Sequence, residues 1–158
     1  MSTAPYMNLI SEVLPIQRRD FYLADTGLLN PNNANPILDG EWLQLDSSYK
    51  LARGSGTQAV PAWQVFAERG RYDTQAIGKA PVLFIGGYEA ETSICDVTGC
   101  AVGDALVVAD VTVGGLTKRG LDKISASTGI YLVFAYVTRL VGTTKLRYWV
   151  NPGWKSVA

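Results

Sequence analysis

Beyond residue 40, apolar and polar residues alternate in short runs, a pattern that predicts β-strands. The runs are rich in β-branched and aromatic residues and lie at 41–49, 60–68, 81–88, 105–113, 130–141 and 144–150. In the first run we expect Leu43, Leu45 and Tyr49 on one face. In the second, Trp63 and Val65 should oppose Gln64 and Phe66.

The connections between these runs predict an antiparallel arrangement. Gly142 and Thr143 separate the last two runs by a hairpin-sized gap. Residues 117–124 (T-K-R-G-L-D-K-I) are the one segment here that reads as a helical turn. Short strands with glycine-rich turns predict an all-β fold, a compact antiparallel β-barrel or sandwich over residues 39–158.

Residues 1–38 have a different pattern, in which prolines and asparagines interrupt apolar side chains. They hold four of the seven prolines and the run N-P-N-N-A-N-P (30–36). Such sequence disfavours long helices and central strands, and only residues 8–14 (Asn8–Leu14) could form a one-turn helix. We therefore predict an extended N-terminal arm that lies either on its own core or on a neighbouring chain.

Within this arm, Arg18 and Arg19 stand directly before Phe21 and Tyr22. Arginine and tyrosine are enriched at interface hot spots, so the cluster predicts a docking contact. A solvated arginine pair beside two core aromatics is the alternative. The candidate partner-binding residues of the arm are Tyr6, Leu9, Ile10, Arg18, Arg19, Phe21 and Tyr22.

Composition narrows the classes of function. The 158 residues carry 14 basic and 14 acidic side chains, so the net charge of zero argues against nucleic acid or an anionic membrane as the partner. The longest apolar run, Ile130–Val137, is far shorter than the roughly 20 residues of a membrane helix, and no export leader is recognisable. We expect a soluble protein, and its low charge favours self-association.

The inventory of reactive side chains predicts that the chain is not an enzyme. Histidine is absent, and Cys95 and Cys100 lack the two further ligands that zinc needs. The two cysteines could form a disulfide or serve as small apolar groups. The glycine runs at 53–56 and 113–120 do not fit a phosphate-binding loop. We expect no catalytic residue, metal or cofactor.

Two other binding functions remain open at this point. Trp63, Phe66, Arg69 and Arg71 could bind single-stranded nucleic acid on an OB-like barrel, although the net charge favours a strand packed into the core. Alternatively, an exposed tryptophan, Trp149 or Trp154, could stack on sugar rings in a carbohydrate-binding or tail module.

Three pieces of the C-terminal half resemble a known family. They are G-D-A-L-V-V (103–108), G-G-L-T-K-R-G (114–120) and Y-V-T-R-L-V-G (136–142). This series, over roughly residues 80–150, resembles the capsid cement or decoration proteins of tailed bacteriophages, which have a compact β domain with the pattern G-D-x-L-x-V … G-x-L-T … V-x-G-x-V. The chain departs from it in V-F-A-Y-V (133–137), where Ala135 replaces the expected glycine.

The resemblance implies a structural role in the virion. Such proteins bind the outside of an icosahedral capsid, often as trimers, and stabilise contacts between major capsid protein subunits. By this resemblance the partners would be the major capsid protein and further copies of this chain. The location would be the capsid exterior, after assembly in the bacterial host cytoplasm, with the arm clasping neighbouring subunits.

Overall fold

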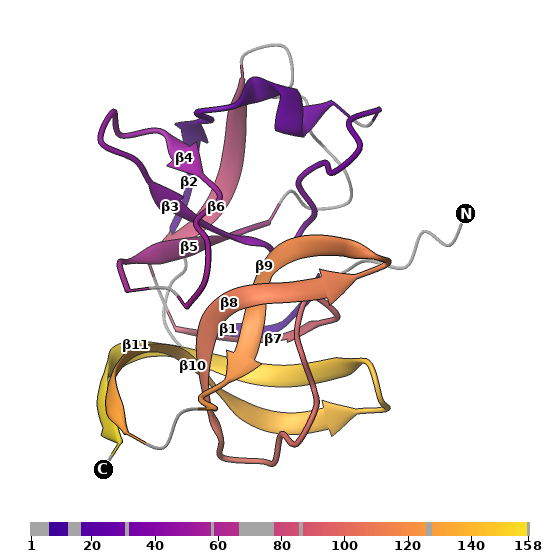
Figure 1. Cartoon of the computed structure of the whole chain (residues 1–158), viewed down its shortest axis with the longest axis vertical. Helices are drawn as coiled ribbons and strands as arrows, with labels where there is room; N and C mark the ends of the chain where they lie inside the picture. The colour runs from indigo at the N-terminus through magenta and orange to yellow at the C-terminus, as the bar shows by residue number, and fades with distance from the viewer. Residues whose placement is uncertain are drawn as a thin grey trace.

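The fold is built almost wholly from β-strands. The computed structural model describes residues 7–12, 17–30, 32–57, 59–66, 78–85, 87–125 and 128–157. In these ranges one 3-10 turn, η1 (Thr26–Leu29), accompanies strands that form two antiparallel sheets (Figure 1). The predicted all-β barrel or sandwich is confirmed.

The first sheet has six strands in the order β1-β7-β11-β10-β8-β9. Their bounds are β1 Met7–Glu12, β7 Tyr88–Thr92, β8 Ala105–Val113, β9 Leu116–Lys123, β10 Gly129–Val141 and β11 Lys145–Val157. Cys95, just after β7, forms a bridge with Leu121 of β9. The Leu121 amide donates to the Ile94 carbonyl at 3.1 Å, and the Asp96 amide donates to the Leu121 carbonyl at 2.9 Å. The sheet therefore curls until the segment after β7 meets its far edge.

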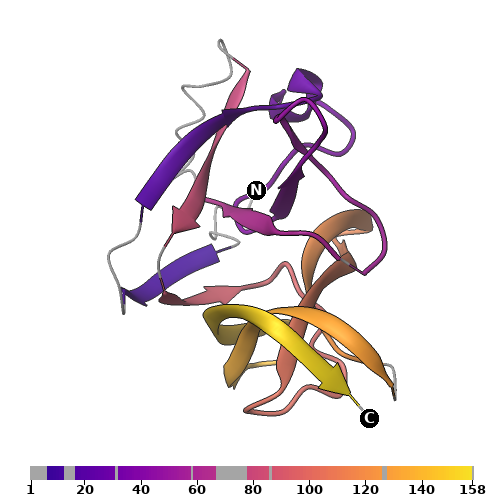
Figure 2. The ribbon, with the colours of Figure 1, turned by 90° about the vertical axis from the view of Figure 1, so that its left-hand side faces the viewer.

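The second sheet has five strands in the order β2-β6-β5-β3-β4. Their bounds are β2 Gln17–Tyr22, β3 Trp42–Leu45, β4 Leu51–Ala52, β5 Ala62–Val65 and β6 Lys79–Ile85. Leu23, directly after β2, bridges Leu51 of β4, and the Ala24 amide donates to the Leu51 carbonyl at 2.9 Å. The two edge strands thus meet, and the strongly curved sheet is seen at the top of Figure 2.

Each sheet encloses a hydrophobic core, and the five-stranded sheet is buried on both faces. Its inner face packs Leu43, Val65 and Val82 with residues of the preceding segment. Its outer face contributes Trp42 and Leu83 to the core of the six-stranded sheet. Strand alternation in β5 is as predicted, but both of its faces are covered.

The described part of the predicted arm belongs to this architecture. β1 is the edge strand beside β7, and β2 is the edge strand beside β6. Leu23, Leu29 and Ile37 pack into the core of the five-stranded sheet. The segment therefore lies on its own chain's core, one of the two placements that the sequence left open. Proline cannot donate a hydrogen bond to a β-ladder, so a segment interrupted by prolines is tolerated best at the edge of a sheet.

Two segments predicted as helical turns are strands in the structure. Residues 8–12, expected as the start of a helical turn, continue β1, where the ladder with β7 supplies their backbone partners. Residues 117–123 belong to β9, which pairs with β8 over its full length. Gly120 allows the close approach of the neighbouring segment, because a Cβ there would lie 2.4 Å from the Ile94 carbonyl oxygen.

The turns give one confirmation and one correction. Residues 142–144 join β10 and β11 at the predicted position, with Gly142 at φ 65°. Tyr49 does not share a face with Leu43 and Leu45. It lies in the turn after β3 with φ 59°, and its side chain is exposed.

Candidate binding site between the two sheets

A buried hydrogen-bond network joins the sheets at Gln64 of β5. The hydroxyls of Tyr88 (β7) and Tyr148 (β11) donate to Gln64 Oε1 at 2.9 and 2.7 Å. Gln64 Nε2 donates to the Gly40 carbonyl at 3.1 Å. Burial raises the pKa of both tyrosines, so the hydroxyls remain donors at neutral pH.

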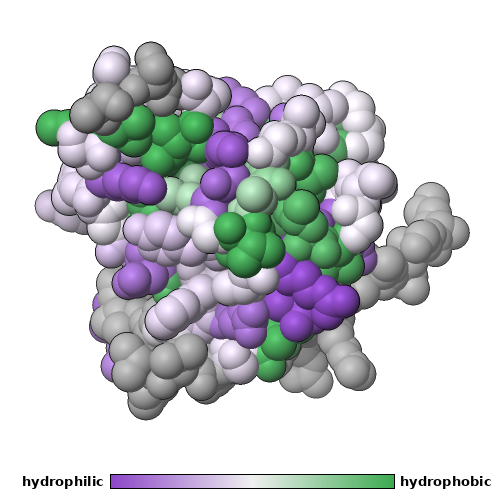
Figure 3. Space-filling view, turned by 90° about the horizontal axis from the view of Figure 1, so that it is seen from below, coloured by the Kyte–Doolittle hydropathy of each residue, from purple (hydrophilic) through white to green (hydrophobic). Residues whose placement is uncertain are grey.

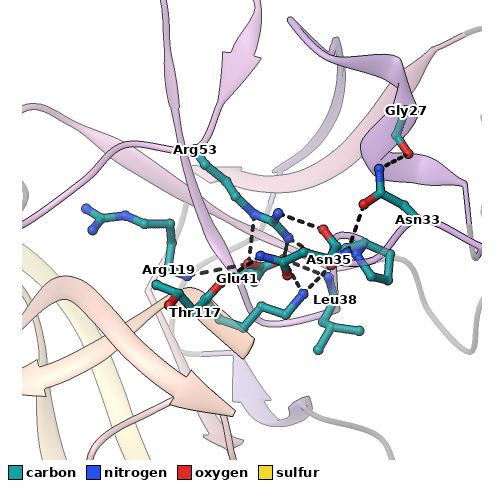
Figure 4. Close-up of polar contacts among 10 residues, drawn as sticks. Gly27, Asn33, Asn35, Leu38, Glu41, Arg53, Thr117 and Arg119 are labelled. Carbon is teal, nitrogen blue, oxygen red and sulfur yellow. Dashed lines mark hydrogen bonds and ion pairs between the residues drawn. The ribbon is translucent and has the colours of Figure 1, made fainter. Parts of the chain in front are cut away.

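A buried ionic cluster forms a second connection, centred on Glu41 (Figure 4). Arg53 donates from Nε to Oε1 of Glu41 at 3.2 Å and from Nη2 to Oε2 at 3.0 Å. Oε2 also accepts from the Leu38 amide at 2.8 Å and lies 4.0 Å from Nζ of Lys118. Burial lowers the pKa of Lys118, and the Glu41 carboxylate acts in the opposite direction. Because Lys118 belongs to β9, the cluster ties the five-stranded sheet to the six-stranded one.

The asparagine- and proline-rich run is held in place by the same cluster. Arg53 Nη1 donates to the Asn35 carbonyl at 2.7 Å, and Nη2 donates to the Pro36 carbonyl at 2.8 Å. Asn35 Nδ2 donates to the Thr117 carbonyl of β9 at 3.1 Å (Figure 4). Lys118 Nζ donates to the Pro36 carbonyl. These contacts give the run a structural role.

A cavity of about 260 Å³ lies between the two sheets. Its lining is almost entirely apolar and consists of Trp42, Pro61, Ala62, Trp63, Leu83, Tyr88, Leu132, Phe134, Val150 and Pro152. The rings of Trp42 and Phe134 meet edge to face, with centroids 5.3 Å apart. Trp42 is buried, and its Nε1 has no hydrogen-bond acceptor among the described residues. The exposed Pro61 and Pro152 place the mouth of the cavity at the surface.

Next to this mouth, the ends of β10 and β11 form a two-stranded ribbon, residues 129–133 and 153–157. β8 pairs with β10 only at Ala135 and Tyr136, and β7 pairs with β11 only at 146–149. Among the described residues, the ribbon strands therefore pair only with each other. The ribbon ends near the C-terminus, at the lower left of Figure 1.

One face of this ribbon is apolar and exposed. Ile130 is 72% exposed and Trp154 is 66% exposed. Trp154 pairs with Leu132, and Ile130 lies two residues before Leu132 on the same strand. Since paired residues and residues two apart share a face, all three belong to the face that lines the cavity. Figure 3, which views the molecule from below, shows several exposed hydrophobic patches on this side.

The candidate arm residues lie on two strands that belong to different sheets, β1 and β2. On β1, Leu9 is half-buried against the core, and Ile10 is 41% exposed. Tyr6 lies outside the described residues.

On β2, the aromatic residues have partners within the chain. Phe21 stacks on Trp63 with ring centroids 6.2 Å apart, and Tyr22 lies under the Lys79 ammonium at 4.6 Å. Arg18 lies opposite Leu83 in the ladder with β6, and the Arg19 side chain is exposed. Tyr22 and Arg19 are thus at the surface, while Phe21 is half-buried.

The other candidate residues are mostly part of the core. Trp63 and Phe66 are half-buried against the two cores, whereas Arg69 and Arg71 lie outside the described residues. Cys95 and Cys100 are buried and unlinked. Burial raises the pKa of the Cys95 thiol to about 12, so it is protonated and unreactive at neutral pH.

Four carboxylates of the six-stranded sheet and its loops have partners within the chain. Glu89 accepts from Thr138 Oγ1 at 2.7 Å, and Glu91 lies 3.4 Å from Arg147. Asp104 forms an ion pair with Lys123 at 2.8 Å, and Asp110 forms one with Arg119 at 2.6 Å. Within the described ranges, no group of three Cys, Asp or Glu side chains could hold a metal ion, and no helix could cross a bilayer.

No protein-family model matches the chain, and no curated protein matches it.

Proposed function

We propose that the chain is a structural protein of a tailed-phage virion. It binds the outer surface of the capsid and stabilises contacts between major capsid protein subunits, without enzymatic activity. The observation that carries this proposal is the ribbon, whose exposed apolar side chains are available to a partner and whose outer strand edges pair with no other described residue.

The ribbon supplies both kinds of contact that a capsid subunit could use. Burying Ile130 and Trp154 against a partner would contribute roughly 1.5–3 kcal/mol for each side chain. The free edges of the ribbon could pair with an extended segment of the capsid subunit. A modest affinity per site is sufficient when many symmetric copies act on one particle.

The sequence pattern of the decoration proteins supports the proposal from another direction. The first piece (103–108) runs into the first half of β8, the second (114–120) forms the turn after β8 and the first part of β9, and the third (136–142) covers the end of β10 and Gly142. The three pieces therefore occupy neighbouring strands. Ala135, which replaces the expected glycine, is fully buried opposite Leu106, and its methyl group fits there.

We further propose that the chain assembles as a trimer on the capsid exterior, with the major capsid protein and further copies of itself as partners. Nucleic acid and membranes have no part in this role. Light scattering coupled to size-exclusion chromatography would then give a native mass near three times 17.1 kDa. A monomer that stays monomeric on isolated capsids would contradict the trimer.

The proposal is tested by adding purified protein to phage heads that lack it and measuring co-sedimentation. The double variant Ile130→Ser/Trp154→Ser should lose binding while its unfolding curve stays near that of the wild type, because both side chains are exposed. The matched control is Tyr49→Ser/Val102→Ser, which also removes one aromatic and one aliphatic exposed side chain. Equal binding by both variants would refute the role of the ribbon, and no binding by the wild type would refute the function.

A carbohydrate-binding or tail-associated module is the second candidate, because Trp154 and Trp149 are 66% and 43% exposed on β11. Exposed tryptophan rings can stack on sugar faces. Binding of the wild type to a glycan array, abolished by Trp154→Ser, would favour this candidate over the capsid role.

A further inference from the structure

We propose that the cavity between the two sheets binds a small, uncharged, largely apolar molecule that carries one hydrogen-bond acceptor. The indole N–H of Trp42 would donate a hydrogen bond to this acceptor. The cavity adjoins the apolar ribbon face and shares Leu132 with it, but the inference does not depend on the proposed capsid role.

The volume of the cavity sets the size of the ligand. An apolar cavity of roughly 150 Å³ is enough to hold benzene. A cavity of about 260 Å³ therefore has room for one substituted ring or a branched chain of similar bulk. Its mouth beside Pro61 and Pro152 provides a path from solvent.

The lining sets the chemistry of the ligand. No charged side chain lines the cavity in the described part of the chain, so an ionic ligand would lose its hydration without compensation. The Trp42–Phe134 pair offers aromatic surface for a flat group. Tyr88 also lines the cavity, and its hydroxyl already donates to Gln64.

The unsatisfied indole N–H of Trp42 indicates that the ligand carries a hydrogen-bond acceptor. Buried donors without an acceptor are rare in folded proteins because each costs stability. Trp42 Nε1 is such a donor, in a residue only 3% exposed that lines the cavity. A carbonyl or ether oxygen bound beside it would satisfy this group, whereas a pure hydrocarbon would leave it unsatisfied.

Two probes of nearly equal size separate the contribution of the hydrogen bond from that of the apolar contact. Acetophenone has a carbonyl oxygen where α-methylstyrene has a methylene group. We expect acetophenone to bind with a Kd on the order of 0.1–1 mM, as befits a ligand of this size. Among the four indole N–H signals in a ¹H–¹⁵N spectrum, it should shift the Trp42 signal downfield, the signal identified by its absence in Trp42→Phe.

The decisive comparison is the effect of Trp42→Phe on each affinity. This change removes the N–H and part of the ring, so both probes lose contact area. Acetophenone should lose about three- to tenfold more affinity than α-methylstyrene, the fold-change expected for one hydrogen bond. Trp149→Phe, which removes an indole N–H outside the cavity, should change neither affinity.

A cavity-filling variant provides a second test that remains valid if Trp42→Phe does not fold. Ala62→Leu places extra side chain in the lining and should abolish binding of both probes while the urea midpoint shows a folded protein. Three results would overturn the proposal. These are no binding by wild type up to the solubility of acetophenone, equal losses for both probes in Trp42→Phe, or undiminished binding in folded Ala62→Leu.

Discussion

Replacing Glu41 with glutamine tests whether the buried ionic cluster holds the two sheets together. The carboxylate is fully buried and accepts hydrogen bonds from Arg53 and the Leu38 amide, with Lys118 Nζ at 4.0 Å. Glutamine keeps the shape but removes the charge, and one of its terminal atoms becomes a donor. Lys118, whose side chain is fully buried, then lacks its compensating charge.

Removing one partner from a buried ion pair costs about 3–5 kcal/mol. Because Arg53 retains some exposure, we expect a value near the lower end, about 3 kcal/mol. With a urea m-value of roughly 2 kcal/mol/M, the unfolding midpoint should fall by about 1.5 M. Tryptophan fluorescence is a suitable readout, because Trp42 adjoins Glu41 in the sequence and lies in the core.

The same substitution at a more exposed ion pair is the matched control. Glu91 lies 3.4 Å from Arg147, and both side chains are partly exposed, so Glu91→Gln should cost less than about 1 kcal/mol. The loss in Glu41→Gln should also shrink when Lys118→Met is present, because the uncompensated cation is then gone. Equal costs for the two glutamine variants, or strict additivity with Lys118→Met, would refute the reasoning.

Three further predictions concern contacts between the strands. Gly120→Ala should lower the free energy of unfolding in urea by about 2–4 kcal/mol, because its Cβ would lie 2.4 Å from a carbonyl oxygen, while Gly153→Ala in open space should change it by less than about 0.5 kcal/mol. Burial raises the pKa of Cys95 from 9.0 to about 12, so the folded chain keeps a proton that the unfolded chain loses above pH 9, and stability falls as pH rises. From about pH 8.5 to about pH 10.5 this fall should be about 2 kcal/mol smaller in Cys95→Ala, and equal slopes would contradict the buried thiol. Gln64→Leu should cost about 2–4 kcal/mol by leaving buried hydroxyls unsatisfied, and clearly less when Tyr148→Phe is already present; an undiminished loss in that background would contradict the network.

Local patterns in the sequence sufficed for most strands beyond residue 40. The hairpin at Gly142 and the alternation in β5 follow from neighbouring residues alone. β9 was missed because its buried positions hold Lys118 and Arg119, whose charges are compensated by Glu41, far away in the sequence, and by Asp110 on the neighbouring strand β8. A pattern of hydrophobicity cannot show such partners.

The same limitation applies to the site. The polar residues in G-E-W-L and A-W-Q-V, Glu41 and Gln64, stand within apolar strands and were a signal of buried polar contacts. Their partners come from other strands and loops, so only the fold shows what they contact. The cavity likewise depends on how the two sheets pack. The exposed Trp154 was a candidate from sequence, whereas Ile130 was read as part of an apolar strand.

Hydrogen–deuterium exchange of the protein with and without phage heads tests the central claim most directly. Within the described part of the free protein, each ribbon strand pairs only with the other, so its outward-facing amides should exchange rapidly. On heads, the account predicts slower exchange in residues 129–133 and 153–157, with the turn at Tyr49 unchanged as an internal reference. Protection that appears elsewhere while the ribbon exchanges as in the free protein would contradict it.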